Sequence, residues 1–304
     1  MNRRKFLRDT TLSGSGILLS QSLRGESLQS LTHPVKSASL MDNVKKYRKI
    51  DSHAHVTFAE GSTATQLDFA DRLHIDRLMI SLNLSPHTKG TPEQFKENND
   101  LIIKNMKAHP DRFIGMMVLN PAYQKESLEE IDRCIDAGMV GTGELYNQIK
   151  INDPLYYPII EKFIDLKMIV HMHSTIGYSR VKLNEREPKN ISIPEDFVDI
   201  SNRYPEAMFQ FAHIGGGIDW EYACKALKDS HNVYVDLSGS SNAGGMIDFA
   251  MKYIGEDRLL FGCDSGYYQG VGHMFSANLT DAQRKKIFFD NYNNILRKSG
   301  NHVD

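Results

Sequence analysis

The sequence predicts a single (β/α)8 barrel over residues 46–304, following an export signal and linker over residues 1–45. Eight short apolar segments recur along this region, and amphipathic segments separate them. The main rival is a doubly wound open sheet, which usually carries a glycine-rich phosphate-binding turn. The glycine cluster Gly215–Gly217 lacks the spacing of such a turn, so the barrel is favoured.

The eight apolar segments are rich in Val, Ile, Leu, Met and Phe and are almost continuously apolar. This pattern is typical of parallel strands that are buried on both faces. The expected strands are Lys49–His55, Arg77–Leu82, Arg112–Leu119, Val140–Leu145, Met168–His173, Met208–His213, Val233–Leu237 and Leu259–Asp264.

The segments between the strands have apolar residues at helical spacing. Ser127 is expected to cap its helix, because Glu130 follows three residues later. The connection Ser174–Pro205 is long and polar, which is typical of a lid or binding loop. The expected helices are Pro92–His109, Ser127–Ala137, Pro154–Leu166, Glu195–Tyr204, Trp220–Asp229, Gly245–Ile254 and Asp281–Lys298.

Composition excludes several classes of protein. The formal net charge is -2, so no strong positive field exists to attract nucleic acid. The three cysteines are widely spaced and form neither a disulfide framework nor a CxxC zinc site. No apolar run is long enough to predict a stable membrane span. A small-molecule substrate is therefore the expected partner, and a homo-oligomer is compatible with the sequence.

The N-terminus carries a twin arginine, Arg3 and Arg4, before a weakly apolar segment. It resembles a twin-arginine export signal, which predicts a periplasmic protein. The alternative is a basic tail on a cytoplasmic protein.

Histidines and carboxylates stand at the carboxyl ends of five expected strands, which is where a barrel of this kind places its active site. They are His53 and His55, Glu144, His171 and His173, His213, and Asp264. Residues two apart share a face of a strand, so each His-x-His pair points to one side. Such groups are costly to bury unpaired, and a divalent cation compensates them. The sequence therefore predicts a metal site with Zn²⁺ as the expected ion.

Each of these residues taken alone has a simpler explanation. Glu144 could pair with Lys150, Asp264 could cap a helix, and His213 could cap a turn before three glycines. His173 is equally compatible with a place beside the metal and with hydrogen bonding to a neighbour. The remaining strand ends carry less specific residues, which are Ser81, Asn83, Asn120, Asp236 and Ser238.

The order of these motifs resembles the amidohydrolase superfamily of metal-dependent hydrolases. IDSHAH, FQFAHIGGG and RLLFGCDSG are similar to the first, sixth and eighth strands of its amidohydrolase-related branch, which includes decarboxylases. The resemblance covers about residues 47–298 and implies a (β/α)8 barrel. It implies that His53, His55, His171 and Asp264 bind one metal ion. It also implies that His213 is a catalytic histidine or a ligand of a second ion, and that Glu144 is a bridging carboxylate.

The resemblance implies hydrolysis of an ester, lactone or amide-type bond by a metal-activated water. In that mechanism Asp264 moves the proton and His213 hydrogen-bonds the developing oxyanion. Two alternatives are a non-oxidative decarboxylase on the same scaffold and a non-catalytic exported metal-binding barrel. Arginines in the long loop favour a carboxylated or lactone substrate, and the alternative is that these charges belong to a solvated loop. The residues expected near it are Tyr178, Arg180, Lys182, Arg186, Tyr267, Tyr268 and His273.

Overall fold

The computed structural model describes residues 39–85, 88–146, 149–174, 190–214, 220–239 and 243–304. Residues Ala38–Asp304 form one compact unit. The twin arginine lies outside the described residues, and so do Tyr178 and the three cationic residues of the long loop.

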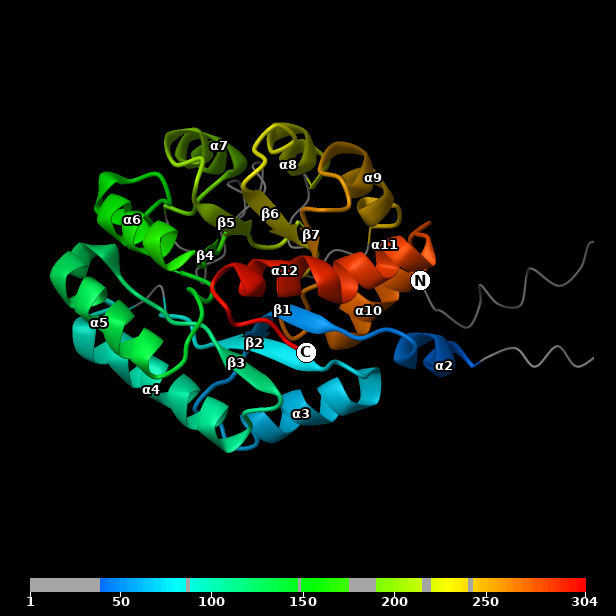
Figure 1. Cartoon of the computed structure of the whole chain (residues 1–304), viewed down its shortest axis with the longest axis horizontal. Coiled ribbons are helices and arrows are strands. Elements are labelled where there is room, and N and C mark those ends of the chain that lie inside the picture. The colour runs from blue at the N-terminus through cyan, green and yellow to red at the C-terminus, as the bar shows by residue number, and fades with distance from the viewer. Residues whose placement is uncertain (1–38, 86–87, 147–148, 175–189, 215–219, 240–242) are drawn as a thin grey trace, which may run out of the picture. The chain divides into compact units, whose positions relative to one another are not determined.

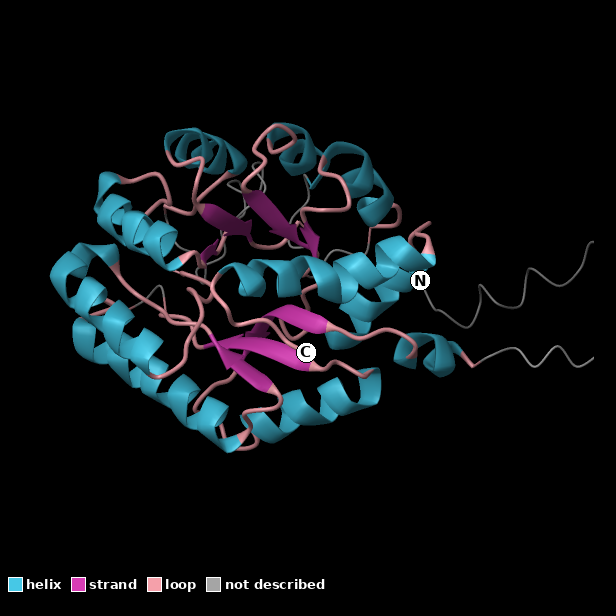
Figure 2. Cartoon of the chain, in the orientation of Figure 1, coloured by secondary structure: helices cyan, strands magenta, loops and turns pink. Residues whose placement is uncertain are grey.

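All of the strand ladders are parallel, and the strands lie inside a layer of helices (Figure 2). One sheet has three strands in the order β1-β2-β3, and the other has four in the order β4-β5-β6-β7. The strands are β1 (Ile50–His55), β2 (Arg77–Ser81), β3 (Phe113–Gly115), β4 (Ile169–Met172), β5 (Met208–Phe211), β6 (Val233–Asp236) and β7 (Leu259–Leu260).

The segment 140–145, which was predicted to be the fourth strand, joins these two sheets. It makes isolated parallel bridges to both neighbours, among them Met117 with Thr142 and Gly141 with Ile169. On the opposite side, the amide of Ser52 donates to Phe261 O at 2.9 Å, and β1 thereby meets the extension of β7. Hydrogen bonds therefore run round a complete ring, and the predicted (β/α)8 barrel is confirmed.

The helices follow the strands in alternation and surround them (Figure 1). They are α2 (Leu40–Lys45), α3 (Ser62–Leu73), α4 (Pro92–Ala108), η1 (Pro121–Tyr123), α5 (Gln124–Asp136), η2 (Pro154–Tyr156), α6 (Tyr157–Leu166), α7 (Pro194–Arg203), α8 (Trp220–Ala226), α9 (Met246–Tyr253), α10 (Tyr267–Ser276), α11 (Asp281–Lys285), η4 (Lys286–Asp290) and α12 (Asn291–Lys298).

Three features of the helices differ from the prediction. Helix α5 begins at Gln124, so Ser127 lies inside it and donates to Asn120 O at 2.8 Å instead of capping. The last predicted helix contains a π-helical turn, η4, between α11 and α12. Helices α3 and α10 were not predicted. Helix α10 contains Gly270 and Gly272, which lower helix propensity and hide its pattern.

The amino-terminal end of the barrel interior is filled by an apolar layer and covered by α12. Nearly every strand contributes one side chain to this layer, including Ile50, Met79, Ile169 and Leu260. Tyr292 of α12 packs against them, and α12 crosses the middle of the view in Figure 1. This packing leaves the carboxyl ends of the strands for polar residues.

Helix α2 lies within the region expected to be the linker. Its Val44 is buried in the main core, and Val44 O accepts a hydrogen bond from the buried ammonium of Lys49 at 2.6 Å. Among the described residues, no helix has both the length and the apolar character needed to cross a membrane.

Candidate metal centre

A break in the pairing of β1 directs the first two histidines into the barrel. Ile50 belongs to the interior layer, and a regular strand would place Ser52 and Ala54 on that same face. The register between β1 and β2 shifts between Asp51 and Ala54, as in a β-bulge. His55 is then paired with Ser81, and both His53 and His55 point into the site.

His213 also departs from regular alternation. Met208 and Gln210 of β5 point into the barrel, so an extended strand would turn residue 213 outward. The backbone of His213 is instead left-handed, with φ of 62°, and its side chain turns into the site. Asp264 has φ of 44°, and its amide donates to His53 O at 2.8 Å. Left-handed backbone at such residues is a recurrent feature of functional sites.

Donor atoms of four side chains lie within 4 Å of His53 Nε2 or His55 Nε2, and we call these four the first donor group. It consists of Nε2 of His53, Nε2 of His55, Oε2 of Glu144 and Oδ1 of Asp264. The two histidine nitrogens are 3.1 Å apart. Glu144 Oε2 lies 3.5 Å from each of them. Asp264 Oδ1 lies 3.8 Å from His53 and 3.3 Å from His55.

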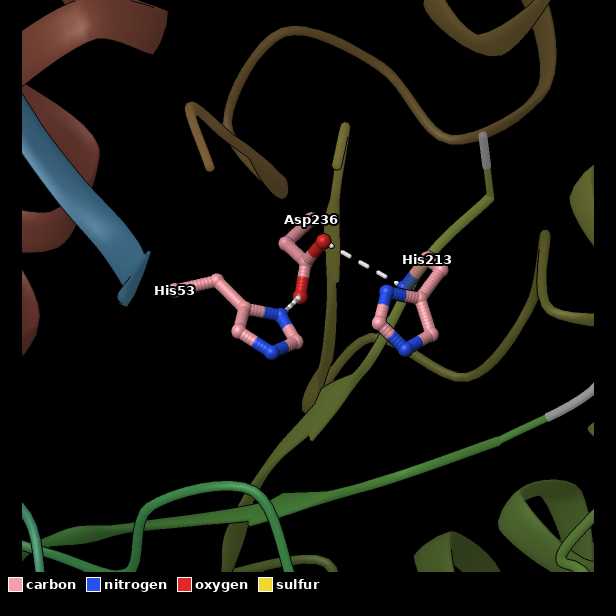
Figure 3. A group of neighbouring side chains, drawn as sticks. All are labelled: His53, His213 and Asp236. Carbon is pink, nitrogen blue, oxygen red and sulfur yellow. Dashed lines mark hydrogen bonds and ion pairs between the residues drawn. The ribbon is translucent and has the colours of Figure 1, made fainter. Parts of the chain in front are cut away.

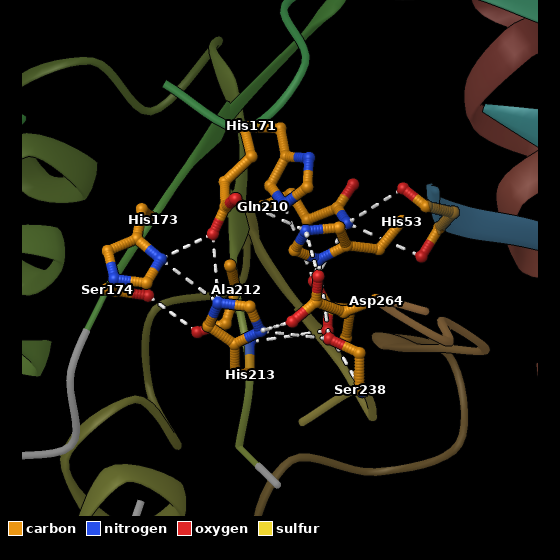
Figure 4. Close-up of polar contacts among 12 residues, drawn as sticks. His53, His171, His173, Ser174, Gln210, Ala212, His213, Ser238 and Asp264 are labelled. Carbon is orange, nitrogen blue, oxygen red and sulfur yellow. Dashed lines mark hydrogen bonds and ion pairs between the residues drawn. The ribbon is translucent and has the colours of Figure 1, made fainter. Parts of the chain in front are cut away.

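The other carboxylate oxygen of Glu144 belongs to a second donor group. Its Oε1 is 2.9 Å from Nε2 of His213, and it also contacts Nδ1 of His173. The two imidazole nitrogens are 3.0 Å apart. Glu144 thus links the two groups through its two oxygens. Figure 4 shows the rings of His173 and His213 turned toward each other.

The spacing of the first donor group fits a metal ion. Donors about 2.1 Å from a tetrahedral ion are about 3.4 Å from one another, and the five separations given above span 3.1–3.8 Å. Imidazole nitrogen and carboxylate oxygen are also suitable ligands for zinc and for similar divalent ions.

The pKa shifts of His53 and His55 are also consistent with a cation site. Burial lowers the pKa of His53, but the carboxylates of Glu144, Asp236 and Asp264 outweigh burial and leave it well above its usual value. Burial likewise opposes protonation of His55, yet hydrogen bonds to Asp264 and Glu144 raise its pKa to about 9. Without a metal the site therefore retains protons on these rings, and a cation can replace them.

His171 was predicted to be a ligand, but the structure places it outside both donor groups. Its buried Nε2 makes no hydrogen bond within the described part of the chain, and it lies 3.5 Å from Asp236 Oδ2. Burial and the charge on His53 lower the pKa of His171 to about 4. Its role as a ligand remains a prediction.

Asp236 and Ser238 were predicted only as less specific residues at a strand end, yet both lie against the site. Asp236 Oδ2 is 3.1 Å from His53 Nδ1, and Ser238 Oγ is 3.1 Å from His213 Nδ1. Burial alone would raise the pKa of Asp236, but the charge on His53 and the nearby ring of His171 hold it well below its usual range. The signal in the sequence was their position at the end of a strand.

Glu144 also has neighbours that hold it in place. Asn83 Nδ2 donates to its Oε2. Lys150, the simpler partner considered for Glu144, pairs instead with Asp196 at 2.8 Å. The adjoining Gly143 leaves room for Ser81, since a Cβ at position 143 would stand 2.1 Å from that of Ser81.

The aromatic residues expected near the substrate divide into two kinds. Tyr267 is buried and stacks on Phe69 with ring centroids 5.0 Å apart, so it belongs to the core. Tyr268 is exposed at the start of α10. Phe58, which was not predicted from the sequence, is exposed after β1. His273 lies in the second half of α10.

The fold and the site place the chain in a known family. The family model described as amidohydrolase matches residues 50–292, so the chain belongs to this family. A gamma-resorcylate decarboxylase from a Rhizobium species is 22% identical over 290 residues, which cover 78% of this chain and 87% of the relative. The chain is a metal-dependent enzyme of the amidohydrolase family.

Solved structures agree on the fold. A 2,6-dihydroxybenzoate decarboxylase from Rhizobium superposes with a TM-score of 0.66 at 16% identity, covering 84% of this chain and all of the other. A dihydroxybenzoic acid decarboxylase from a Polaromonas species, solved with bound manganese, gives a TM-score of 0.62 at 17% identity. The match covers 83% of this chain and 97% of that structure.

Proposed function

We propose that the enzyme is a divalent-metal-dependent, non-oxidative decarboxylase of a small aromatic carboxylic acid. The observation that carries this proposal is the match to a gamma-resorcylate decarboxylase over 78% of the chain. It favours the decarboxylation that the sequence left as an alternative over hydrolysis of an ester, lactone or amide, which was the main prediction. Phe58 and Tyr268 offer exposed aromatic surface beyond β1 and β7 for an apolar ring.

The reaction replaces a carboxylate by a proton. The carbon–carbon bond to the carboxylate breaks, carbon dioxide leaves, and the electron pair that remains on the ring carbon takes up a proton. When bound, the ion supplies positive charge that holds substrate oxygens and stabilises negative charge as it develops. No water is consumed.

Asp264 is the residue best placed to carry the proton. Its side chain is 32% exposed, whereas those of Glu144 and Asp236 are 4% and 0% exposed. Its Oδ1 faces His53 and His55, and its Oδ2 is turned toward His213, whose Nδ1 lies 3.6 Å away. One oxygen can therefore help to hold the ion while the other exchanges a proton with the substrate.

The first donor group would hold the ion through His53, His55, Glu144 and Asp264. Zinc is the expected ion from the ligand types, and manganese is the alternative suggested by the Polaromonas structure. The second donor group, with His173 and His213, could hold a second ion that shares Glu144.

Hydrolysis remains a second candidate because of this shared carboxylate. Two ions that share one carboxylate are an arrangement suited to generating a nucleophilic hydroxide from water. Decarboxylation needs no such nucleophile, so isotopic labelling separates the two reactions.

The experiment supplies the zinc- or manganese-loaded protein with 2,6-dihydroxybenzoate and related aromatic acids in deuterated water. We expect carbon dioxide and a product with one deuterium on the carbon that lost its carboxylate. A parallel reaction with ester, lactone and amide substrates uses ¹⁸O-labelled water. Decarboxylation would be refuted if the ester, lactone or amide substrates were turned over with ¹⁸O at the cleaved bond while none of the aromatic acids was turned over. Asp264→Asn is the test of the proton carrier, with metal content measured beside activity.

A further inference from the structure

Asp236 is the last residue of β6, and Ser238 follows two residues later; both contact histidines of the two donor groups. Both side chains are almost fully buried. Figure 3 shows the carboxylate of Asp236 between the ring of His53 and the backbone nitrogen of His213. Neither residue is needed as a ligand in the proposed centre, so their contacts call for another explanation.

The oxygens of Asp236 are already occupied. Oδ2 is 3.1 Å from His53 Nδ1 and accepts from Gln210 Nε2 at 3.1 Å. Oδ1 accepts from the amide of Ser238 at 3.0 Å and from that of His213 at 3.3 Å. An ionised carboxylate offers about four acceptor sites, and the hydroxyl of Ser238 is a further donor. The acceptor sites of Asp236 are therefore taken up by partners within the protein.

The protons in this network can be assigned by counting donors. Ser238 Oγ lies 2.5 Å from Asp236 Oδ1, so its single hydrogen must point at the carboxylate. The alternative would place oxygen lone pairs face to face at that distance. With its hydrogen committed, Ser238 Oγ can only accept from His213 Nδ1, which is 3.1 Å away. His213 then carries a hydrogen on Nδ1.

The same argument applies to His53. His53 Nδ1 faces Asp236 Oδ2, which accepts only, so this nitrogen also carries a hydrogen. His55 Nδ1 lies 3.3 Å from Ser81 Oγ, a hydroxyl that can either donate or accept, so this contact leaves the tautomer of His55 open. The other nitrogen, Nε2, is the one that His53 contributes to the first donor group and His213 to the second.

We propose that Asp236 and Ser238 are positioning residues that fix His53 and His213 as Nδ1–H tautomers, so that each presents an unprotonated Nε2 to the metal centre. The inference rests on the proposed metal centre. Hydrogen-bond partners behind a ligating histidine usually contribute 10–100-fold to metal affinity or activity. Asp236 also links β6 to β1 through His53 and to β5 through Gln210.

The test uses zinc-loaded protein with ¹⁵N-labelled histidine and long-range NMR correlations that distinguish Nδ1–H from Nε2–H rings. In the natural protein we expect His53 and His213 to show Nδ1–H signals. Asp236→Asn turns an amide toward His53, and we expect zinc affinity to fall about 10–100-fold by competition with a chelator. Glu130→Gln is the matched control, because Glu130 is equally buried and contacts Asn99 and Arg133 instead.

Ser238→Ala tests the second contact, and Ser238→Thr retains the hydroxyl. We expect the alanine variant to lose the Nδ1–H signal pattern of His213 and the threonine variant to retain it. Unchanged histidine spectra and zinc affinity in both Asp236→Asn and Ser238→Ala would overturn the inference. If the natural protein binds no zinc or manganese, the metal centre itself fails, which is a different outcome from normal binding in the variants.

Discussion

Metal binding should release protons, because two of the expected ligands hold them in the metal-free protein. His55 has a pKa of about 9, and that of His53 is also well above its usual value. Both nitrogens that face the first donor group must lose their protons before they can bind an ion. We therefore expect zinc loading of the chelated protein at pH 7 to release about two protons.

The magnitude follows from the shift at His55. At pH 7 this ring is two units below its pKa, so about 1% is neutral and deprotonation costs about 2.7 kcal/mol. Apparent zinc affinity should rise about tenfold per displaced proton between pH 7 and pH 8. The pKa of His55 is raised in the folded protein, so its ion pairs stabilise the metal-free fold fully at pH values below the ordinary histidine pKa. This stabilisation is lost as the pH rises through about 9.

Titration calorimetry in two buffers of different ionisation enthalpy measures the number of protons released. Measurements at pH 7 and pH 8 give the change in affinity. His302→Ala is a suitable control, because His302 is 42% exposed and pairs with Asp304. Release of less than about half a proton, together with an affinity that does not depend on pH, would show that the charge balance derived for the site is wrong.

Two further predictions concern the site and the barrel. Glu144→Gln removes the charge shared by both donor groups, so we expect a loss of at least about tenfold in metal affinity. Elemental analysis should then find less bound metal in this variant than in the control variant Glu130→Gln. Arg258→Ala removes a buried guanidinium that donates to Leu227 O at 3.0 Å and Lys228 O at 2.7 Å. We expect a loss of about 3 kcal/mol and a Tm lower by about 6–12 °C in thermal unfolding, and a Tm within about 2 °C of the natural protein would contradict this.

Much of the fold and part of the site followed from the sequence. A nearly continuous apolar segment of strand length indicates a strand that is buried on both faces. This pattern depends only on residues that are neighbours in the sequence, so each expected strand was found near its predicted position. Polar residues at strand ends then marked His53, His55, Glu144, His213 and Asp264, which the barrel brings together. Helix α3 was missed because it does not carry a strong apolar stripe, and α10 because of its glycines.

Alternation of side chains along a strand determined that His53 and His55 share a face, but not which face it is. A shift of register against β2 turns both rings into the barrel, and that shift depends on a partner strand about 25 residues away. The left-handed backbone of His213 is a similar case, because its amide is held by Asp236 from the next strand. Asp236 and Ser238 acquire their roles only through these neighbours. Residue type and spacing therefore predicted the chemistry of the site. The direction in which each side chain points, and the hydrogen-bond partner of each imidazole, depend on contacts between strands.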